Sequence, residues 1–95
     1  DRIRQTTVYS QWFNRLRGRQ ARFRIVARIR RLSLGNPGDS RSVGESVHEL
    51  RIDYGPGYRV YFTKRGRTVV VLLAGGDKKT QARDIERAKN LARRL

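Results

Sequence analysis

The stretch from Val47 to Arg65, VHELRIDYGPGYRVYFTKR, constrains the fold of this chain more than any other segment. Apolar and polar residues alternate on both sides of a Gly55-Pro56-Gly57 turn, which is the pattern of two half-buried strands. Proline presets φ at the second position of a turn and glycine accepts a positive φ at the third, so a type II turn is favoured. The stretch therefore predicts a hairpin with one buried and one displayed face.

Residue parity assigns the side chains of this hairpin to its two faces. The buried face is expected to hold His48, Leu50, Ile52, Tyr58, Val60 and Phe62. We interpret His48 as a core or sheet-rim histidine because it shares this face. The opposite face is expected to display Glu49, Arg51, Arg59 and Tyr61 together.

The net charge is the second constraint. The chain has 95 residues and a net charge of +15, with 33% charged residues and far more arginine than lysine. Because self-repulsion opposes compaction, such a charge predicts a polyanionic partner, which is a nucleic acid, an acidic protein or both. A basic surface that is merely solvated is the alternative.

The same composition bounds the class of protein. A hydrophobic content of 37% is compatible with a single domain over residues 1–95. The absence of cysteine excludes disulfides and thiol chemistry and is compatible with a cytoplasmic protein. No apolar run approaches the roughly 20 residues of a membrane span, and no signal segment opens the chain.

The N-terminal half predicts one weak strand and two helices. Ile3–Thr7 is expected to form an edge strand, and Thr6 or Thr7 to cap a helix with an apolar stripe of Tyr9, Trp12, Phe13 and Leu16. After Gly18, a second helix over Arg19–Leu34 has a stripe of Ala21, Ile25, Ile29 and Leu32, with Phe23 and Val26 beside it. Gly35–Ser46, rich in Gly, Pro and Ser, is expected to be a loop.

The C-terminal half predicts a third strand and a last helix. The apolar run Thr68–Ala74 is typical of a strand covered on both faces, and Gly75-Gly76 is expected to end it. In the last helix Thr80 is the candidate cap, and the buried stripe consists of Ile85, Ala88, Leu91, Ala92 and Leu95. The order strand, helix, helix, three strands, helix predicts an α+β fold with helices packed on a small antiparallel sheet.

The available chemistry is that of arginine, lysine and tyrosine acting on phosphate. One histidine, no cysteine and scattered acids provide no metal-ligating set, and the glycines follow no nucleotide-binding spacing, so we expect no metal and no cofactor. RNA carries its own nucleophile, the 2′-hydroxyl. A protein can promote its attack by aligning the strand and stabilising the charge that develops on the phosphoryl oxygens.

The roles of individual residues follow from this chemistry. Arg51 and Arg59 are candidate charge stabilisers, and Tyr61 is a candidate stacking platform or proton donor. Glu49 is a candidate base, and the alternative is that it pairs with Arg51 or Arg59 across the strands. Lys78 and Lys79 could reach the same site or simply grip phosphates. The residues expected to contribute to RNA binding are Lys64, Arg65, Lys79 and Gln81.

The runs VHELRIDYGPGYRVYF and LLAGGDKKTQARDIERAK resemble the RelE/ParE superfamily of bacterial toxins, above all its phage-derived, HigB-like "addiction module killer" branch. With FRIVARIRRLSLGNPGD, the likeness covers nearly the whole chain. It implies a microbial-ribonuclease-like fold and a type II toxin held inactive by an antitoxin, for which a HigA-like helix-turn-helix protein is expected. It also implies metal-independent mRNA cleavage in the ribosomal A site.

The resemblance also implies site residues. Arg51 matches a basic residue of the family's second strand, Arg59 its third-strand arginine, and Lys78 or Lys79 the basic position after the last strand. Glu49 stands where RelE-type toxins have a second lysine, and no tyrosine follows Tyr61, although RelE-like toxins often end in a catalytic one. Two alternatives therefore stay open: a ParE-type inhibitor of DNA gyrase, and a non-catalytic basic module that binds nucleic acid.

Overall fold

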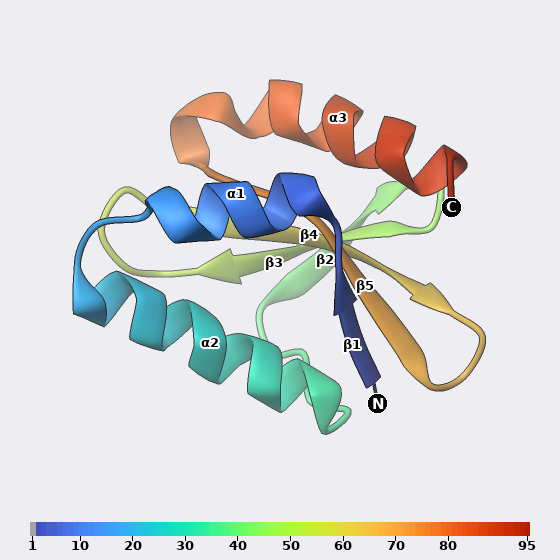
Figure 1. Ribbon diagram of the computed structural model, residues 1–95, viewed down its shortest axis with the longest axis horizontal. Coiled ribbons are helices and arrows are strands. Elements are labelled where there is room, and N and C mark those ends of the chain that lie inside the picture. Colours follow the sequence, from blue (N-terminus) through green and yellow to red (C-terminus); the bar gives the residue numbers. More distant parts are fainter. Residues whose placement is uncertain (1) are drawn as a thin grey trace.

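Three helices pack around one sheet in the computed structural model, which describes residues 2–95 (Figure 1). The elements are β1 (Arg2–Gln5), α1 (Thr7–Arg15), α2 (Arg19–Ser33), β2 (Ser40–Gly44), β3 (Val47–Ile52), β4 (Tyr58–Arg65), β5 (Val69–Asp77), the short 3₁₀ helix η1 (Lys78–Thr80) and α3 (Gln81–Arg93). The predicted α+β class is confirmed. Between residues 2 and 95 no helix has the length and apolarity needed to cross a membrane.

The five strands follow the order β1-β5-β4-β3-β2. β3, β4 and β5 are antiparallel neighbours, as expected, and β2 pairs with β3 in the same way, but β1 pairs with β5 in parallel, with Ile3 opposite Val70. The sheet is therefore mixed rather than wholly antiparallel. Only strands joined by a tight turn must run in opposite directions, and β1 and β5 are separated by most of the chain.

The expectation of a loop over Gly35–Ser46 is wrong in its second half, where β2 forms an edge strand. β2 pairs with β3, and Arg41 lies opposite Glu49. Glu45 and Ser46 connect the two strands with φ values of 54° and 64°, as a hairpin turn of the I′ type requires. The segment lacks the apolar alternation that predicts a strand, because its side-chain contacts with the sheet are made by a single apolar residue, Val43, and by Arg41, which pairs with Glu49.

α1 begins at one of the two predicted caps, and each N-terminal helix ends one residue before the last residue predicted for it, at Arg15 and Ser33. The Thr6 hydroxyl accepts a hydrogen bond from the Tyr9 N–H at 3.1 Å and caps α1. Gly18 and Gly35 flank α2 with φ values of 90° and 87°, a region that favours glycine.

One face of the sheet packs against α1 and α2. Leu50 and Val60 lie in this core with Tyr9 of α1 and Ile25 of α2. On the same face, the rings of His48 and Phe62 stack with centroids 5.3 Å apart. The interpretation of His48 as a core or rim histidine is confirmed.

The opposite face packs against α3, so the central strands are covered on both sides (Figure 1). Val47, Tyr61 and Leu73 meet Ala88 of α3 there. β5 supplies Leu72 to the first face and Leu73 to the second, which confirms the prediction of a doubly covered strand.

Three apolar residues lie outside the packing expected for them. Phe23 and Val26 of α2 are 70% and 52% exposed, and Leu95 is 46% exposed beyond the end of α3. The first two face away from the sheet because Ala21, Ile25 and Leu32 already fill the buried stripe of α2.

Thr80 stands at the start of α3 without capping it by its side chain. Its hydroxyl instead donates to the Asp84 carboxylate. Asp77 accepts from the Lys79 N–H at 2.8 Å and caps η1.

Gly75 and Gly76 lie inside β5 rather than ending it. They are required because two helices approach the strand backbone at this point. A Cβ at Gly75 would lie 2.1 Å from a ring carbon of Trp12, and one at Gly76 would lie 1.9 Å from an Asp84 carboxylate oxygen. Trp12 also meets Tyr58 edge-on, so it packs in the core as predicted.

We expect Gly75→Ala to lower the free energy of unfolding by about 2 kcal/mol, because the added methyl group overpacks the Trp12 contact. Denaturant unfolding measures this. The matched background is Trp12→Leu, in which the same glycine change should cost about 1 kcal/mol less. Equal costs in both backgrounds would show that the Trp12 ring does not make Gly75 necessary.

Candidate functional site

The predicted display of four polar side chains on one hairpin face is wrong for two of them. Glu49 and Tyr61 are 0% exposed, because α3 covers this face of β3 and β4. Arg51 and Arg59 share the face but lie nearer the end of the hairpin, and both are partly exposed. The surface that reaches solvent is therefore smaller than predicted and lies at the strand ends.

The buried Glu49 carboxylate is held by three donors from three elements. Arg41 Nε of β2 donates to Oε1 at 2.9 Å. Gln81 Nε2 of α3 and the Tyr61 hydroxyl of β4 donate to Oε2 at 2.7 and 3.2 Å. Arg41, rather than Arg51 or Arg59, is thus the ion-pair partner of Glu49, because β2 places it directly opposite.

These contacts fix the protonation of both buried groups. Burial by itself raises the pKa of Glu49, but the hydrogen bonds from Arg41, Gln81 and Tyr61 outweigh it and hold the pKa below its ordinary value of 4.5. Burial, together with the adjacent Glu49 charge, raises the pKa of the Tyr61 hydroxyl. Near neutral pH Glu49 is therefore an ionised acceptor and Tyr61 a neutral donor, and each is committed to the other.

The two remaining arginines form one cross-strand pair. Arg51 lies directly opposite Arg59 in the β3–β4 register, so both side chains leave the same face. With Lys78, they line a hollow of about 310 Å³ beside the Gly55-Pro56-Gly57 turn. In Figure 1 this turn lies on the same side of the molecule as the start of α3. Three of the predicted catalytic residues therefore meet, and of the two candidate lysines it is Lys78 that lines the hollow.

Arg51 is held by an exposed carboxylate. Its Nε and one terminal nitrogen donate to Asp39 Oδ1 at 3.1 and 2.9 Å, and the two side chains are 41% and 54% exposed. An ion pair in this setting contributes little to stability. A phosphate could therefore replace Asp39 on the Arg51 guanidinium at low cost.

Arg59 is fixed by the backbone of the turn. One terminal nitrogen donates to the carbonyl oxygens of Gly57 and Tyr58, each at 3.2 Å. Gly57 has the predicted positive φ, 82°, but the predicted type II turn is wrong. The Gly57 N–H donates to the Tyr54 carbonyl, so Gly55, with a φ of 56°, is the second residue of the turn and Pro56 the third. A Cβ at Gly57 would contact Arg59 and Lys78 at 3.4 and 3.5 Å, so the glycine keeps this part of the hollow open.

The predicted RNA-binding residues do not all lie near this hollow. Lys64 and Arg65 are exposed at the other end of β4, about 17 and about 20 Å from Arg59 by strand length. Lys79 is exposed beside Lys78, and Gln81 is half-buried with its amide directed at Glu49. The four predicted RNA-binding residues therefore lie in two separate regions, the far end of β4 and the start of α3.

Sequence reasoning missed the carboxylates of the site. Asp39 and Asp53 also line the hollow. Asp39 precedes Arg51 by 12 positions and belongs to the segment expected to be a loop. Arg28 of α2 positions this segment by donating to the backbone carbonyls of Pro37 and Asp39, and no local pattern signals such a contact.

Glu49→Gln should destabilise the chain by about 1–3 kcal/mol, because an amide offers one acceptor oxygen where three donors converge. The pKa of Glu49 is lower in the folded than in the unfolded chain. Its stabilisation is therefore present above about pH 4.5 and is lost as the pH falls through the folded value. Chemical unfolding measured from pH 7 to pH 3 should show the gap between wild type and variant narrowing.

The matched control is Glu86→Gln on the exposed side of α3. It should leave both the stability and its pH dependence nearly unchanged. A constant gap between wild type and Glu49→Gln across this pH range would contradict the assignment of an ionised, stabilising Glu49.

Sequence comparisons identify the family. The family model described as phage-derived protein Gp49-like (DUF891) matches residues 11–95. An uncharacterized protein of Haemophilus influenzae is 47% identical over 93 residues, which cover 98% of this chain and 94% of that protein. No solved structure matches the chain significantly. The chain therefore belongs to the phage-derived Gp49-like family.

Proposed function

We propose that this protein is the toxin of a type II toxin–antitoxin system, and that it cuts mRNA on the ribosome without a metal ion. The Gp49-like family is one of addiction-module toxins, which supports the toxin assignment. The observation that carries the nuclease assignment is the meeting of Arg51, Arg59 and Lys78 in one hollow. The protein would act in the cytoplasm, and an antitoxin, for which we propose a HigA-like helix-turn-helix protein, would neutralise it.

The proposed reaction is attack of the RNA 2′-oxygen on the adjacent phosphorus. The bond from phosphorus to the 5′-oxygen breaks, leaving a 2′,3′-cyclic phosphate and a 5′-hydroxyl. Arg59 and Arg51 would bind the phosphoryl oxygens as negative charge develops on them, which is a task suited to the guanidinium fork. Because the turn carbonyls hold Arg59 in place, little reorganisation is needed when the charge develops.

Proton transfer would involve the other groups of the hollow. Asp39 or Asp53 is the candidate acceptor for the 2′-hydroxyl proton, and the Lys78 ammonium is the candidate donor to the departing 5′-oxygen. Glu49 and Tyr61, the candidates from sequence analysis, are enclosed under α3. We propose that they position β3 and β4 beneath the site and do not contact RNA.

Inhibition of DNA gyrase is the second candidate function. It is favoured by the enclosure of Tyr61, because no tyrosine is among the described residues that line the hollow. A basic module that only binds nucleic acid is the third candidate, and it would need the positive charge without the arrangement of the hollow.

Arg59→Ala should abolish growth arrest and reduce mRNA cleavage at least about 100-fold, because it removes the fixed charge stabiliser. Primer extension on translated message after induction detects the cuts. The melting temperature should stay close to that of wild type, since Arg59 is a partly exposed residue outside the apolar core.

Arg67→Ala is the matched control, because Arg67 is an exposed arginine in the β4–β5 turn. It should remain toxic and should cleave. Growth arrest with intact message and with relaxed or cleaved plasmid would instead support the gyrase mechanism. Salt-sensitive binding to nucleic acid without toxicity would support the binding module.

A further inference from the structure

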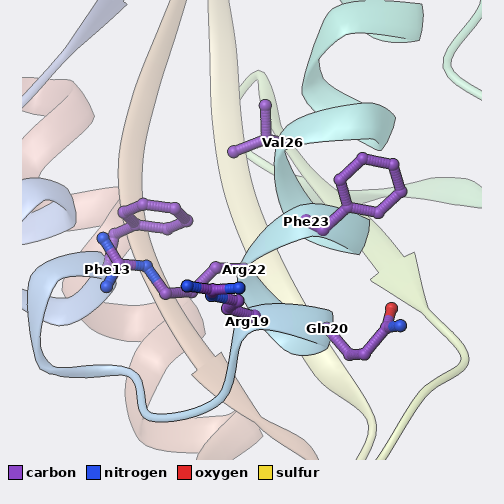
Figure 2. A pocket seen from close by; sticks show the side chains of 6 residues that line it. All are labelled: Phe13, Arg19, Gln20, Arg22, Phe23 and Val26. Carbon is purple, nitrogen blue, oxygen red and sulfur yellow. The ribbon is translucent and has the colours of Figure 1, made fainter.

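A hollow of about 690 Å³ lies between the end of α1 and the start of α2 (Figure 2). We call it the α1–α2 groove. It is lined by Phe13, Arg19, Gln20, Arg22, Phe23 and Val26. Figure 2 shows Phe13 and Phe23 on opposite sides, with the Arg22 side chain extending toward Phe13. The Arg22 guanidinium lies over the Phe13 ring, 5.1 Å from its centroid.

Two of the three apolar residues of this groove lie outside the core, whereas the third, Phe13, packs against it. Phe23 and Val26 are 70% and 52% exposed. They are three positions apart on α2, so they lie on the same side of the helix and form one surface strip. Two large exposed apolar side chains that line one hollow indicate an interaction site.

The charged residues that line the groove are of one sign. Residues 2–38, which include all of α1 and α2, contain ten arginines and no aspartate or glutamate. Within the groove, Arg19 and Arg22 border the apolar strip. This combination is complementary to a segment that carries apolar residues on one side and carboxylates beside them.

We propose that the α1–α2 groove binds an acidic, amphipathic helix of a partner protein, which, if the proposed function holds, is the antitoxin. A helix of this kind inserts apolar anchors at spacings of three and four residues, and its carboxylates would pair with Arg19 and Arg22. Single-stranded RNA fits less well. Its bases would stack on the Phe23 ring but not on the exposed, aliphatic Val26, whereas the apolar side of a helix packs against both side chains.

The position of the groove explains how such a partner would neutralise the toxin. A neighbouring hollow along α2 is lined by Gln20 and Phe23, which also line the groove, and by Asp53, which also lines the Arg51–Arg59 hollow. A segment that leaves the groove along α2 therefore arrives at the edge of the proposed cleavage site. Binding in the groove would restrict access of the ribosome to that edge.

The test measures binding of the purified chain to the purified product of the adjoining reading frame by titration calorimetry. The double variant Phe23→Ser/Val26→Ser should bind at least about tenfold more weakly, because it removes the two exposed apolar side chains against which the partner helix would pack. The matched control is Leu34→Ser. Leu34 is 75% exposed at the end of the same helix but does not line the groove, so this change should alter binding less than twofold.

A second pair of readouts separates this inference from the proposed function. Without the partner, Phe23→Ser/Val26→Ser should arrest growth and cleave message like wild type, and co-expression of the partner should no longer relieve the arrest. The charge-reversal variant Arg19→Glu/Arg22→Glu should also bind the partner more weakly. It tests the groove independently should the serine variant fail to fold, as judged by circular dichroism.

Three outcomes would overturn the inference. Unchanged partner affinity in both groove variants would leave the toxin assignment intact but would show that the α1–α2 groove does not bind the partner. Weaker binding of an oligouridylate with unchanged partner affinity would assign the groove to RNA. A wild-type dimer in sedimentation that becomes monomeric in Phe23→Ser/Val26→Ser would assign it to a second copy of the chain. Failure of the proposed function itself would instead appear as intact message with wild-type protein.

Discussion

Coverage of the sheet on both faces determines where this chain can expose functional side chains. α1 and α2 close one face of the central strands and α3 closes the other. A polar side chain in mid-strand must then find its partners inside, as Glu49 does through Arg41, Gln81 and Tyr61. Side chains near the β3–β4 turn lie beyond the covering helices and can remain partly exposed. The cations that can act together are therefore found at this end of the sheet.

The two arginines of that end are prepared for different tasks. Arg59 is anchored to backbone carbonyls of its own turn, which cannot move without disturbing the hairpin. Arg51 is held only by an exposed side chain, Asp39, which a phosphate can displace. One guanidinium thus provides a fixed charge and the other an exchangeable contact. Such a pair suits a site that first admits a polyanion and then stabilises the charge that develops on it.

Charge and apolar surface are distributed differently over the two functional regions. The hollow at the hairpin contains both cations and carboxylates, including Asp39 and Asp53. Residues 2–38, which include α1 and α2, contain arginines but no aspartate or glutamate, and they expose Phe23 and Val26. Proton transfer needs groups of both kinds close together, whereas docking of an acidic helix needs only cations beside an apolar strip. This difference is why we assign reaction chemistry to one region and partner binding to the other.

The sequence by itself determined the features that depend on neighbouring residues: the stripes of α1 and α2, a threonine cap at Thr6 or Thr7, and the shared hairpin face of Arg51 and Arg59. Tertiary structure alone decided that α3 would bury Glu49 and Tyr61, and that Asp39 would reach Arg51. Periodicity reports which side chains share a face but not what covers that face. A polar face looks solvent-exposed in the sequence until distant donors, such as Gln81 at 32 positions from Glu49, arrive to satisfy it.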